Sequence, residues 1–319
     1  MITESLANLE SPDWVNHISY VEKSLKAELQ TQAGFLRKLK EESEKTRKHQ
    51  IDSLLAAFYN SGTDLLDERV DTFTSTIYRI NQNAQISLQY DLLNTIKTNP
   101  AVHAYPCLND AKTLLLADST SKLLHERIAA VLFKISNQTL SQSNKSNAGV
   151  AGELFARAIL SSVGLQPNKH YREQYQSDTG SDTDIAFPNI KDREDAKLEV
   201  LVAIQISTND RARLTSSELK KGVVGYVVTG NGLKASTKAL KDIGTQIISG
   251  YRENNIRLVC HRDEIQIELD RITSLIKTSP NRNELLTRKK YFEESAFSFS
   301  DFADKMSRFL TIQRGAKTL

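Results

Sequence analysis

Cysteine is almost lacking from this sequence, with only Cys107 and Cys260 among 319 residues. Two cysteines so far apart in the chain exclude a disulfide framework and a cysteine-rich zinc site. A cysteine that has no such role usually behaves as a small hydrophobic residue. We therefore expect both thiols to be buried in the core.

Long apolar runs are also lacking, and neither sign of charge dominates. No stretch approaches the roughly 20 apolar residues of a membrane span, and the N-terminal MITESLANLESPDW has no basic segment followed by an apolar one. The 42 basic and 39 acidic residues give a formal net charge of +3, which neither indicates nor excludes nucleic-acid binding. With 39% hydrophobic and 25% charged residues, we expect a water-soluble cytoplasmic protein with no membrane partner.

The first part of the chain has the apolar periodicity of helices. From Ser11 to Asn60, apolar residues recur at intervals of three and four with few breakers, which predicts one long amphipathic helix. Further helical stretches follow, so residues 1–136 are predicted to form a helical N-terminal domain. Its charged segment 37–50 is typical of a solvated helix face, but it could also contact phosphates or serve as a dimer arm.

The sequence changes character after residues 137–149, which are rich in serine and asparagine and are predicted to be a linker or loop. Over 150–262, short β-branched runs alternate with helical stretches in the order α-β-β-β-α-β-α-β, which predicts a mixed sheet flanked by helices. The last of these helices is expected at 234–255. Residues 263–319 return to helical periodicity and are predicted to be a helical C-terminal extension. The strands are expected at 169–176, 183–190, 198–207, 223–230 and 256–260.

Two acidic residues and a polar strand end are the candidates for chemistry. Asp182 and Asp184 lie two residues apart, so in an extended segment both face the same way and could bind a hard divalent cation. An isolated copy of this pattern is more typical of a capped surface turn. In the strand VLVAIQIS, Ala203, Gln205 and Ser207 share one face. A buried Gln205 without polar partners would cost about 1–3 kcal/mol, so it needs either a metal ion with its water or neighbouring backbone.

Taken together, these residues resemble the PD-(D/E)XK nuclease superfamily, the fold of most type II restriction endonucleases. The resemblance covers roughly residues 149–260 and includes the opening helix, the SDTDI segment and the VAIQIS strand. It implies a restriction-endonuclease-like mixed sheet and a Mg²⁺ cofactor that Mn²⁺ can replace. By position it makes Asp184 the metal-binding aspartate and Asp182 a further ligand. It places Gln205 where the family has a second acid, Ser207 where it has a lysine, and Glu153 where a helix glutamate supports the site.

Ser207 is the main departure from the family pattern, because serine cannot supply the positive charge that a lysine brings to the phosphate or the attacking water. Three explanations stay open. A lysine could come from elsewhere, with Lys197, Lys220 and Lys221 as candidates; the metal could act with water alone; or the chain could be an inactive copy. Gln205 is a milder change, since its carbonyl oxygen can still bind a metal without bringing negative charge.

Basic residues follow the polar strand directly. Arg211, Arg213, Lys220 and Lys221 would lie at the mouth of the proposed site, where they suit a phosphate backbone or guanine edges, although a solvated basic loop explains them as well.

The resemblance implies a Mg²⁺-dependent, sequence-specific endodeoxyribonuclease of a bacterium or archaeon. Cleavage of both strands of double-stranded DNA requires two sites, so we expect a homodimer with the N-terminal domain in dimer contacts or DNA clamping. Three alternatives remain: a catalytically inactive DNA-binding protein with the same fold, a repair or mobile-element nuclease, and a helical scaffold whose α/β part is structural.

Overall fold

The computed structural model describes residues 6, 9–32, 34–116, 122–178, 182–205, 219 and 222–310. For residues 31, 32, 122, 139–151 and 182 it describes the backbone alone. The chain divides into two compact units, the first made of Met1–Asp52 and Tyr78–Asn147 and the second of Ser53–Ile77 and Ala148–Leu319.

The first unit is helical. Its elements are α2 (Trp14–Ala27), the π-helical turn η1 (Glu28–Gln32), α3 (Phe35–Ala56), the later part of α4 (Leu66–Thr98), η2 (Pro100–Ala104), α5 (Pro106–Leu116) and the first part of α6 (Lys122–Ser162). The single long helix predicted from Ser11 to Asn60 is wrong, because Gly34 has a φ of +63° and separates α2 from α3. In the charged segment of α3, Arg37 and Glu41 form an i,i+4 ion pair with a nitrogen–oxygen distance of 3.8 Å.

The predicted loop at 137–149 is also wrong, because α6 runs through it without interruption, although the boundary between the two units does fall inside it, between Asn147 and Ala148. Serine and asparagine lower helix stability by only about 0.5 kcal/mol per residue relative to alanine, and the segment contains no proline. Extending an existing helix costs less than nucleating a second one. A polar composition therefore did not make this segment a loop.

Both cysteines are buried and neither forms a disulfide, which confirms the expectation for them. Cys107 lies at the start of α5, where the buried Glu28 carboxylate accepts hydrogen bonds from the backbone N–H groups of Cys107 (3.2 Å) and Leu108 (3.0 Å). A carboxylate at a helix N-terminus satisfies amides that have no partner within the helix. Glu28 thereby joins η1 to α5.

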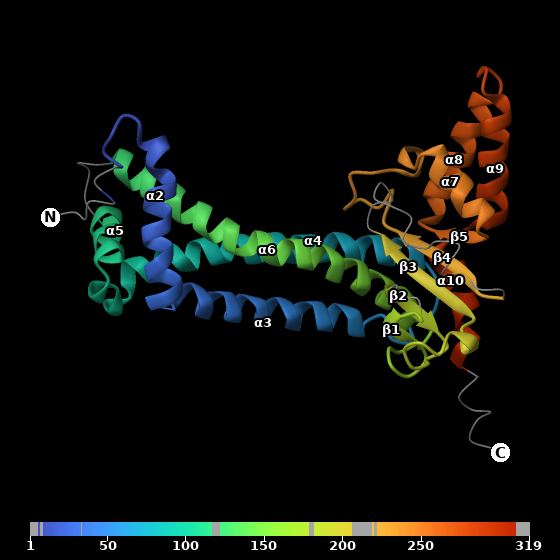
Figure 1. The fold of residues 1–319 in the computed structure, drawn as a ribbon, viewed down its shortest axis with the longest axis horizontal. Coiled ribbons are helices and arrows are strands. Elements are labelled where there is room, and N and C mark those ends of the chain that lie inside the picture. Colours follow the sequence, from blue (N-terminus) through green and yellow to red (C-terminus); the bar gives the residue numbers. More distant parts are fainter. Residues whose placement is uncertain are drawn as a thin grey trace, which may run out of the picture. The chain divides into compact units, whose positions relative to one another are not determined.

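The second unit is built on a mixed sheet in the strand order β1-β2-β3-β4-β5-β6 (Figure 1). β1 pairs antiparallel with β2 and β2 antiparallel with β3, and the pairs from β3 to β6 are parallel. The mixed α/β class predicted from the sequence is confirmed. The strands are β1 (Arg172–Gln176), β2 (Asp182–Phe187), β3 (Val200–Gln205), β4 (Val224–Thr229), β5 (Ile256–Val259) and β6 (Ala296–Phe297).

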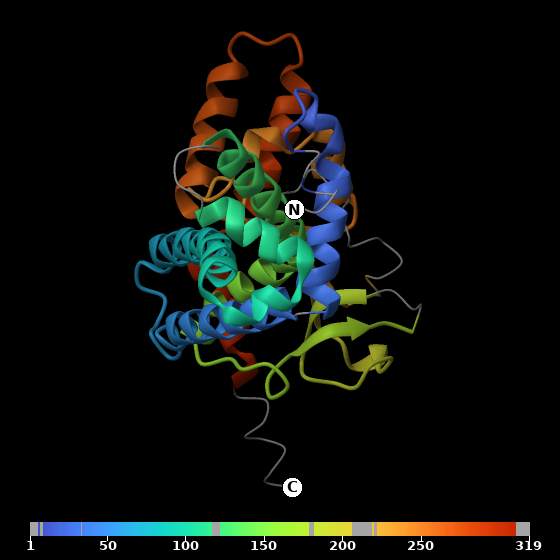
Figure 2. The ribbon, with the colours of Figure 1, turned by 90° about the vertical axis from the view of Figure 1, so that its left-hand side faces the viewer.

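Helices α7 (Thr245–Glu253), α8 (Arg262–Leu275) and α9 (Arg282–Ser295) cover one face of the sheet. Figure 2 shows α8 and α9 side by side, joined by a turn. Their apolar residues share one core with the sheet, as Tyr251 of α7 and Tyr291 of α9 do with Val227. Residues after 262 are mainly helical, as predicted, and they complete the α/β unit by packing on the sheet and adding β6 to it.

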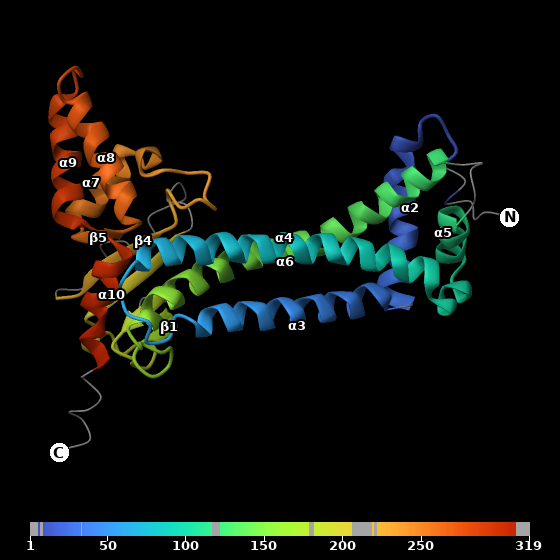
Figure 3. The same cartoon turned by 180° about the vertical axis from the view of Figure 1, so that it is seen from behind.

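Helix α10 (Phe299–Ser307) covers the other face (Figure 3). The ring of its Phe302 lies 5.1 Å from that of Tyr226 on β4, measured between centroids. Phe299 meets Phe155 of α6 edge-on at the same distance, so α6 and α10 pack together on this side. The sheet is buried between two layers of helices, as its almost continuous apolar strands require.

Asp67 explains why Ser53–Ile77 belongs to the second unit and not with the helical domain predicted for residues 1–136. Its buried carboxylate accepts backbone hydrogen bonds from Arg262 (2.9 Å), Phe299 (3.2 Å) and Ser300 (3.3 Å). These amides belong to the first turns of α8 and α10. One side chain of α4 thus caps both helices, and the charge suits their N-terminal dipoles.

The connection from β4 to α7 is mainly a loop, where the sequence predicted a helix over 234–255. That prediction is wrong in its first half, since α7 begins only at Thr245 after a short 3-10 turn at Leu240–Asp242. Asn231 donates its side-chain N–H to the carbonyl of Ala239 at 3.0 Å. This bond stabilises a loop conformation that the apolar periodicity could not indicate.

His170 gives the second unit a predicted pH dependence. Its buried ring accepts a hydrogen bond at Nδ1 from the backbone N–H of Gln166 (3.0 Å), and burial together with the neighbouring Lys169 lowers its pKa. The unfolded chain therefore binds a proton more readily than the folded one, so the contribution of His170 to the unfolding free energy is present above the ordinary pKa of about 6.5 and is lost as the pH falls below it.

We expect His170→Asn, which keeps an acceptor in place but cannot be protonated, to reduce this loss. Urea unfolding of both proteins at pH 7.5 and 5.5 measures it, and equal losses would contradict the assignment.

Candidate active site

Asp184 lies where β2 and β3 stop pairing. The paired residues run from Phe187 and Val200 to Ile185 and Val202, and Asp184 is one step beyond the last pair. There its Oδ2 accepts the backbone N–H of Ile204 at 2.6 Å. The carboxylate thus gives a hydrogen-bond acceptor to an amide of β3 that lies beyond the residues paired with β2. It is held against β3 one residue before Gln205.

Gln205 is the last residue of β3 and is 6% exposed. Because Ala186 pairs with Leu201, alternation along both strands puts Asp184, Ala203 and Gln205 on one face, towards α7 and α9. The sequence predicted this shared face of Ala203 and Gln205. The structure adds that Asp184 belongs to it and lies beside the end of β3.

Two buried polar residues that the sequence did not single out continue the site across β4. Gln205 pairs with Thr229, whose hydroxyl donates to Oδ1 of Asn231 at 3.0 Å and accepts the Asn231 N–H at 3.1 Å. Both residues are fully buried. Because β3 and β4 are parallel, their carboxyl ends meet at the same edge of the sheet. In the sequence, the polar TGN segment directly after a buried strand was the signal for these two residues.

Glu153 lies on α6, which packs with α10 on the face of the sheet opposite to Asp184 and Gln205. Its Oε1 accepts a hydrogen bond from Nε2 of Gln174 at 3.1 Å, and Gln174 lies on β1 between the residues that pair with Thr183 and Ile185, opposite Asp184. Gln174 has a φ of +49°, an unusual backbone conformation for a residue other than glycine. Such outliers cluster at functional sites, and this one turns β1 beside the candidate carboxylate.

An ion pair one turn further along α6 fixes the helix on β1. Arg157 donates two hydrogen bonds of 2.6 Å to the carboxylate of Glu173, in the bidentate geometry typical of strong pairs. The bond to Glu173 raises the pKa of the Arg157 guanidinium, so the pair stays charged. Because Arg157 follows Glu153 by four residues, this contact helps to position Glu153.

Several predicted site residues lie outside the residues that the structure describes. They are Ser207, Arg211, Arg213, Lys220 and Lys221, while Asp182 is described by its backbone alone at the start of β2. Lys197, one possible source of the missing lysine, is described. It pairs with Glu194 at 3.2 Å and lies just before Val200, the first residue of β3. Gln205 is the last residue of β3, so the length of the strand, about 16 Å, separates the two. A lysine side chain cannot span that distance, and Lys197 is not the replacement.

The donors at this edge suit a hard divalent cation. Asp184 and Gln205 offer a carboxylate and an amide oxygen, the ligand type that Mg²⁺ and Mn²⁺ prefer. Among the side chains that the structure describes, no group of three or more His, Cys, Asp or Glu residues is close enough to hold a metal ion. Metal binding at this site would therefore combine Asp184 with the neutral Gln205 and with water.

No family model matches the sequence, and no curated protein is significantly similar to it. None of the helices in the described part of the chain combines the length and the apolar character that crossing a membrane requires.

Proposed function

We propose that the second unit is a restriction-endonuclease-like domain and that the protein is a Mg²⁺-dependent, sequence-specific endodeoxyribonuclease. The strand pairing supports it, because β1 to β3 are antiparallel and β3 is parallel to β4, as in the family's core. The helix expected between β3 and β4 lies outside the residues that the structure describes. The substrate is double-stranded DNA, and a cytoplasmic homodimer supplies the two sites that a double-strand cut requires.

The contact between Asp184 and β3 is the observation that carries this proposal. The Asp184 carboxylate is bonded directly to the backbone of β3, one residue before Gln205. The backbone of β3 therefore fixes how close Asp184 and Gln205 lie. Asp184 and Gln205 would hold the ion, which supplies charge stabilisation at the phosphate. Glu153 would have at most an outer supporting role, held by Gln174 of β1. Burial of Gln205, Thr229 and Asn231 excludes water from one side of the site.

A DNA-binding protein that has lost cleavage is the second candidate. The hydrogen bond from Ile204 gives Asp184 a structural role. An aspartate would therefore be useful at this position even in a protein that does not cleave DNA. Ser207 and the placement of Lys197 favour the same alternative. This candidate predicts salt-dependent duplex binding with no cleavage in Mg²⁺ or Mn²⁺.

One experiment separates these candidates. Purified protein is incubated with unmodified and methylated phage DNA in Mg²⁺, Mn²⁺ or EDTA, and the products are sized and their ends sequenced. Discrete fragments with common ends, formed only with metal, support the nuclease. Intact DNA with a retained gel shift supports the inactive binding protein. Absence of both excludes the two candidates and favours the scaffold.

Replacing Gln205 with glutamate tests the metal site without relying on cleavage. The variant adds a second carboxylate at a buried position next to Asp184, so we expect it to lose about 2–4 kcal/mol of unfolding free energy in EDTA. Mg²⁺ would bind the two acids and restore most of that loss, because a ligand bound only by the folded state stabilises it. Thermal unfolding in EDTA and in Mg²⁺ measures both effects.

Gln266→Glu is the matched control, because it makes the same change on an exposed part of α8, beside Asp270. Its stability should respond little to Mg²⁺. A Gln205→Glu protein that Mg²⁺ stabilises no more than this control would remove Gln205 from the metal site.

A further inference from the structure

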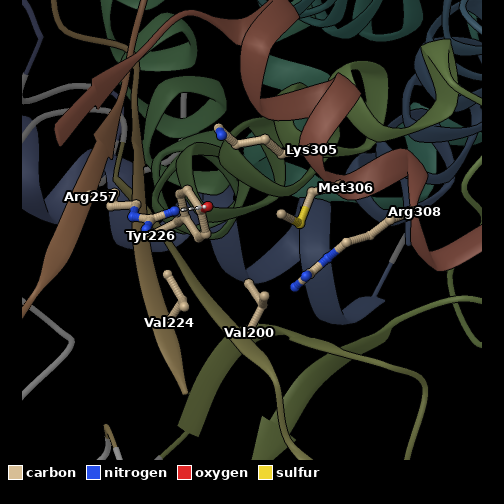
Figure 4. Close-up of a pocket in the computed structure, with 7 residues that line it drawn as sticks. All are labelled: Val200, Val224, Tyr226, Arg257, Lys305, Met306 and Arg308. Atoms are coloured by element: carbon tan, nitrogen blue, oxygen red, sulfur yellow. Dashed lines mark hydrogen bonds between the residues drawn. The ribbon is translucent and has the colours of Figure 1, made fainter. Parts of the chain in front are cut away.

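The second unit contains a cavity of about 360 Å³ between α10 and the beginnings of β3 and β4. Figure 4 shows its side chains converging from the sheet and from the helix. An apolar floor is combined with several cationic groups. The residues that line it are Val200, Val224, Tyr226, Arg257, Lys305, Met306 and Arg308.

The described lining carries three cations and no carboxylate. Arg308 is paired with Glu199 at 3.5 Å, outside the lining. Arg257 donates a hydrogen bond to the hydroxyl of Tyr226 at 2.9 Å, and among the described residues neither Arg257 nor Lys305 forms an ion pair with a carboxylate. The charge near the cavity, with Glu199 included, is therefore about two positive units.

Arg257 and Lys305 are gathered round one aromatic ring. The Arg257 guanidinium lies 5.6 Å and the Lys305 ammonium 4.8 Å from the centroid of Phe297. A cation–π contact of this kind explains why one cation would lie against this ring. Together they place two like charges at one cavity without an acid between them. A bound anion would remove this unfavourable arrangement.

The cavity is separate from the candidate active site. Val200 begins β3 and Gln205 ends it, so about 16 Å of strand lies between them. Tyr226 also faces α10, whereas Gln205 faces the α7 side. A ligand bound in this cavity would therefore not contact the candidate active site.

We infer that the cavity binds a small phosphate monoester whose organic part is apolar or aromatic. Such an ester carries a charge of about −1.5 to −2 at pH 7, which matches the two net positive units of the site. Its phosphate accepts hydrogen bonds from Arg257 and Lys305, and its organic part packs on Val200, Val224 and Met306. The volume falls in the range of small-molecule sites.

The probe is 4-fluorophenyl phosphate, titrated into the full chain and followed by ¹⁹F NMR, with 4-fluorophenol and inorganic phosphate as its two halves. We expect saturable binding of the ester and weaker binding of each half. Lys305→Met and Arg257→Met keep an aliphatic chain on Phe297 but remove the charge, so each should weaken binding by about tenfold. Lys305 is exposed, so its variant tests the site even where the Arg257 variant fails to fold.

Lys290→Met on α9 is the matched control, because Lys290 is exposed and pairs with Glu294. It should leave binding unchanged. No saturable binding of the ester at millimolar concentration, or equal weakening by Lys290→Met, overturns the inference. Tighter binding of a 5′-phosphorylated dinucleotide than of the ester also overturns it and indicates a nucleic-acid end instead. Binding should survive Asp184→Asn, which separates this inference from the proposed function.

Discussion

Replacing Asp184 with asparagine is expected to lower the rate of the proposed DNA cleavage by about a thousandfold, because a metal ion that lowers the barrier by about 4 kcal/mol would lose its charged ligand. The amide oxygen of asparagine can still accept the hydrogen bond from Ile204, so the end of β3 should keep its conformation. Duplex binding should persist. Single-turnover cleavage in Mg²⁺ and a gel shift in the same buffer measure the two properties.

Asp192→Asn is the matched control, because this half-exposed carboxylate also lies in the second unit and pairs with Arg172 at 3.5 Å. It should cut at the rate of the unaltered protein. An Asp184→Asn protein that cuts equally fast would show that another carboxylate binds the metal. A large loss of DNA binding together with cleavage would instead indicate that Asp184 serves the fold.

The sequence predicted secondary structure best where a local pattern of apolar residues is compatible with only one kind of element. VLVAIQ and VGYVVT are apolar runs too short for buried helices, and both are central strands of the sheet. The short β6 was missed, because two residues carry no periodicity and Ala296 and Phe297 become a strand only by pairing with β5. Gly34 was overlooked as a break because a single glycine in a helical pattern is often tolerated.

The candidate site could be predicted in part, for a similar reason. Alternation along β3 placed Gln205 on a definite face, and this needs no tertiary information. The neighbours of Gln205 depend on which strands pair and in which register, so the TGN sequence could mark Thr229 as polar but could not place it beside Gln205. Gln174 is distinguished only by its positive φ, which no property of glutamine indicates.

Replacing Arg288 with methionine is expected to lower the unfolding free energy of the second unit by about 3–5 kcal/mol, because it takes one of two arginine partners from the buried Glu268 and a donor from a buried carbonyl. Arg288 and Glu268 are 5% and 2% exposed and lie 2.7 Å apart. Burial would raise the pKa of Glu268, but the bond from Arg271 and the charge of Arg288 outweigh burial and lower it. Urea unfolding followed by circular dichroism measures the loss.

Arg288 also joins two further segments, so its loss should exceed that of a simple ion pair. Its guanidinium donates to the carbonyls of Ile243 (2.7 Å) and Leu240 (2.9 Å), which belong to the connection before α7. The Ile243 carbonyl would lose its charged donor in the variant, and an unsatisfied buried group costs about 1–3 kcal/mol, whereas the Leu240 carbonyl would keep the backbone N–H of Ile243 at 3.1 Å. Arg282→Met, at the exposed start of α9, makes the same change without these contacts and should cost under about 0.5 kcal/mol.

The double variant Glu268→Leu/Arg288→Met decides whether charge or packing makes Arg288 necessary. Removing both partners leaves no buried charge, and apolar replacement of buried ion pairs is often neutral. We therefore expect the double variant to lose less stability than the two single variants combined, by about 2 kcal/mol. Additive losses would mean that Arg288 acts through the Ile243 and Leu240 carbonyls, and the connection from β4 to α7 would then depend on this arginine alone.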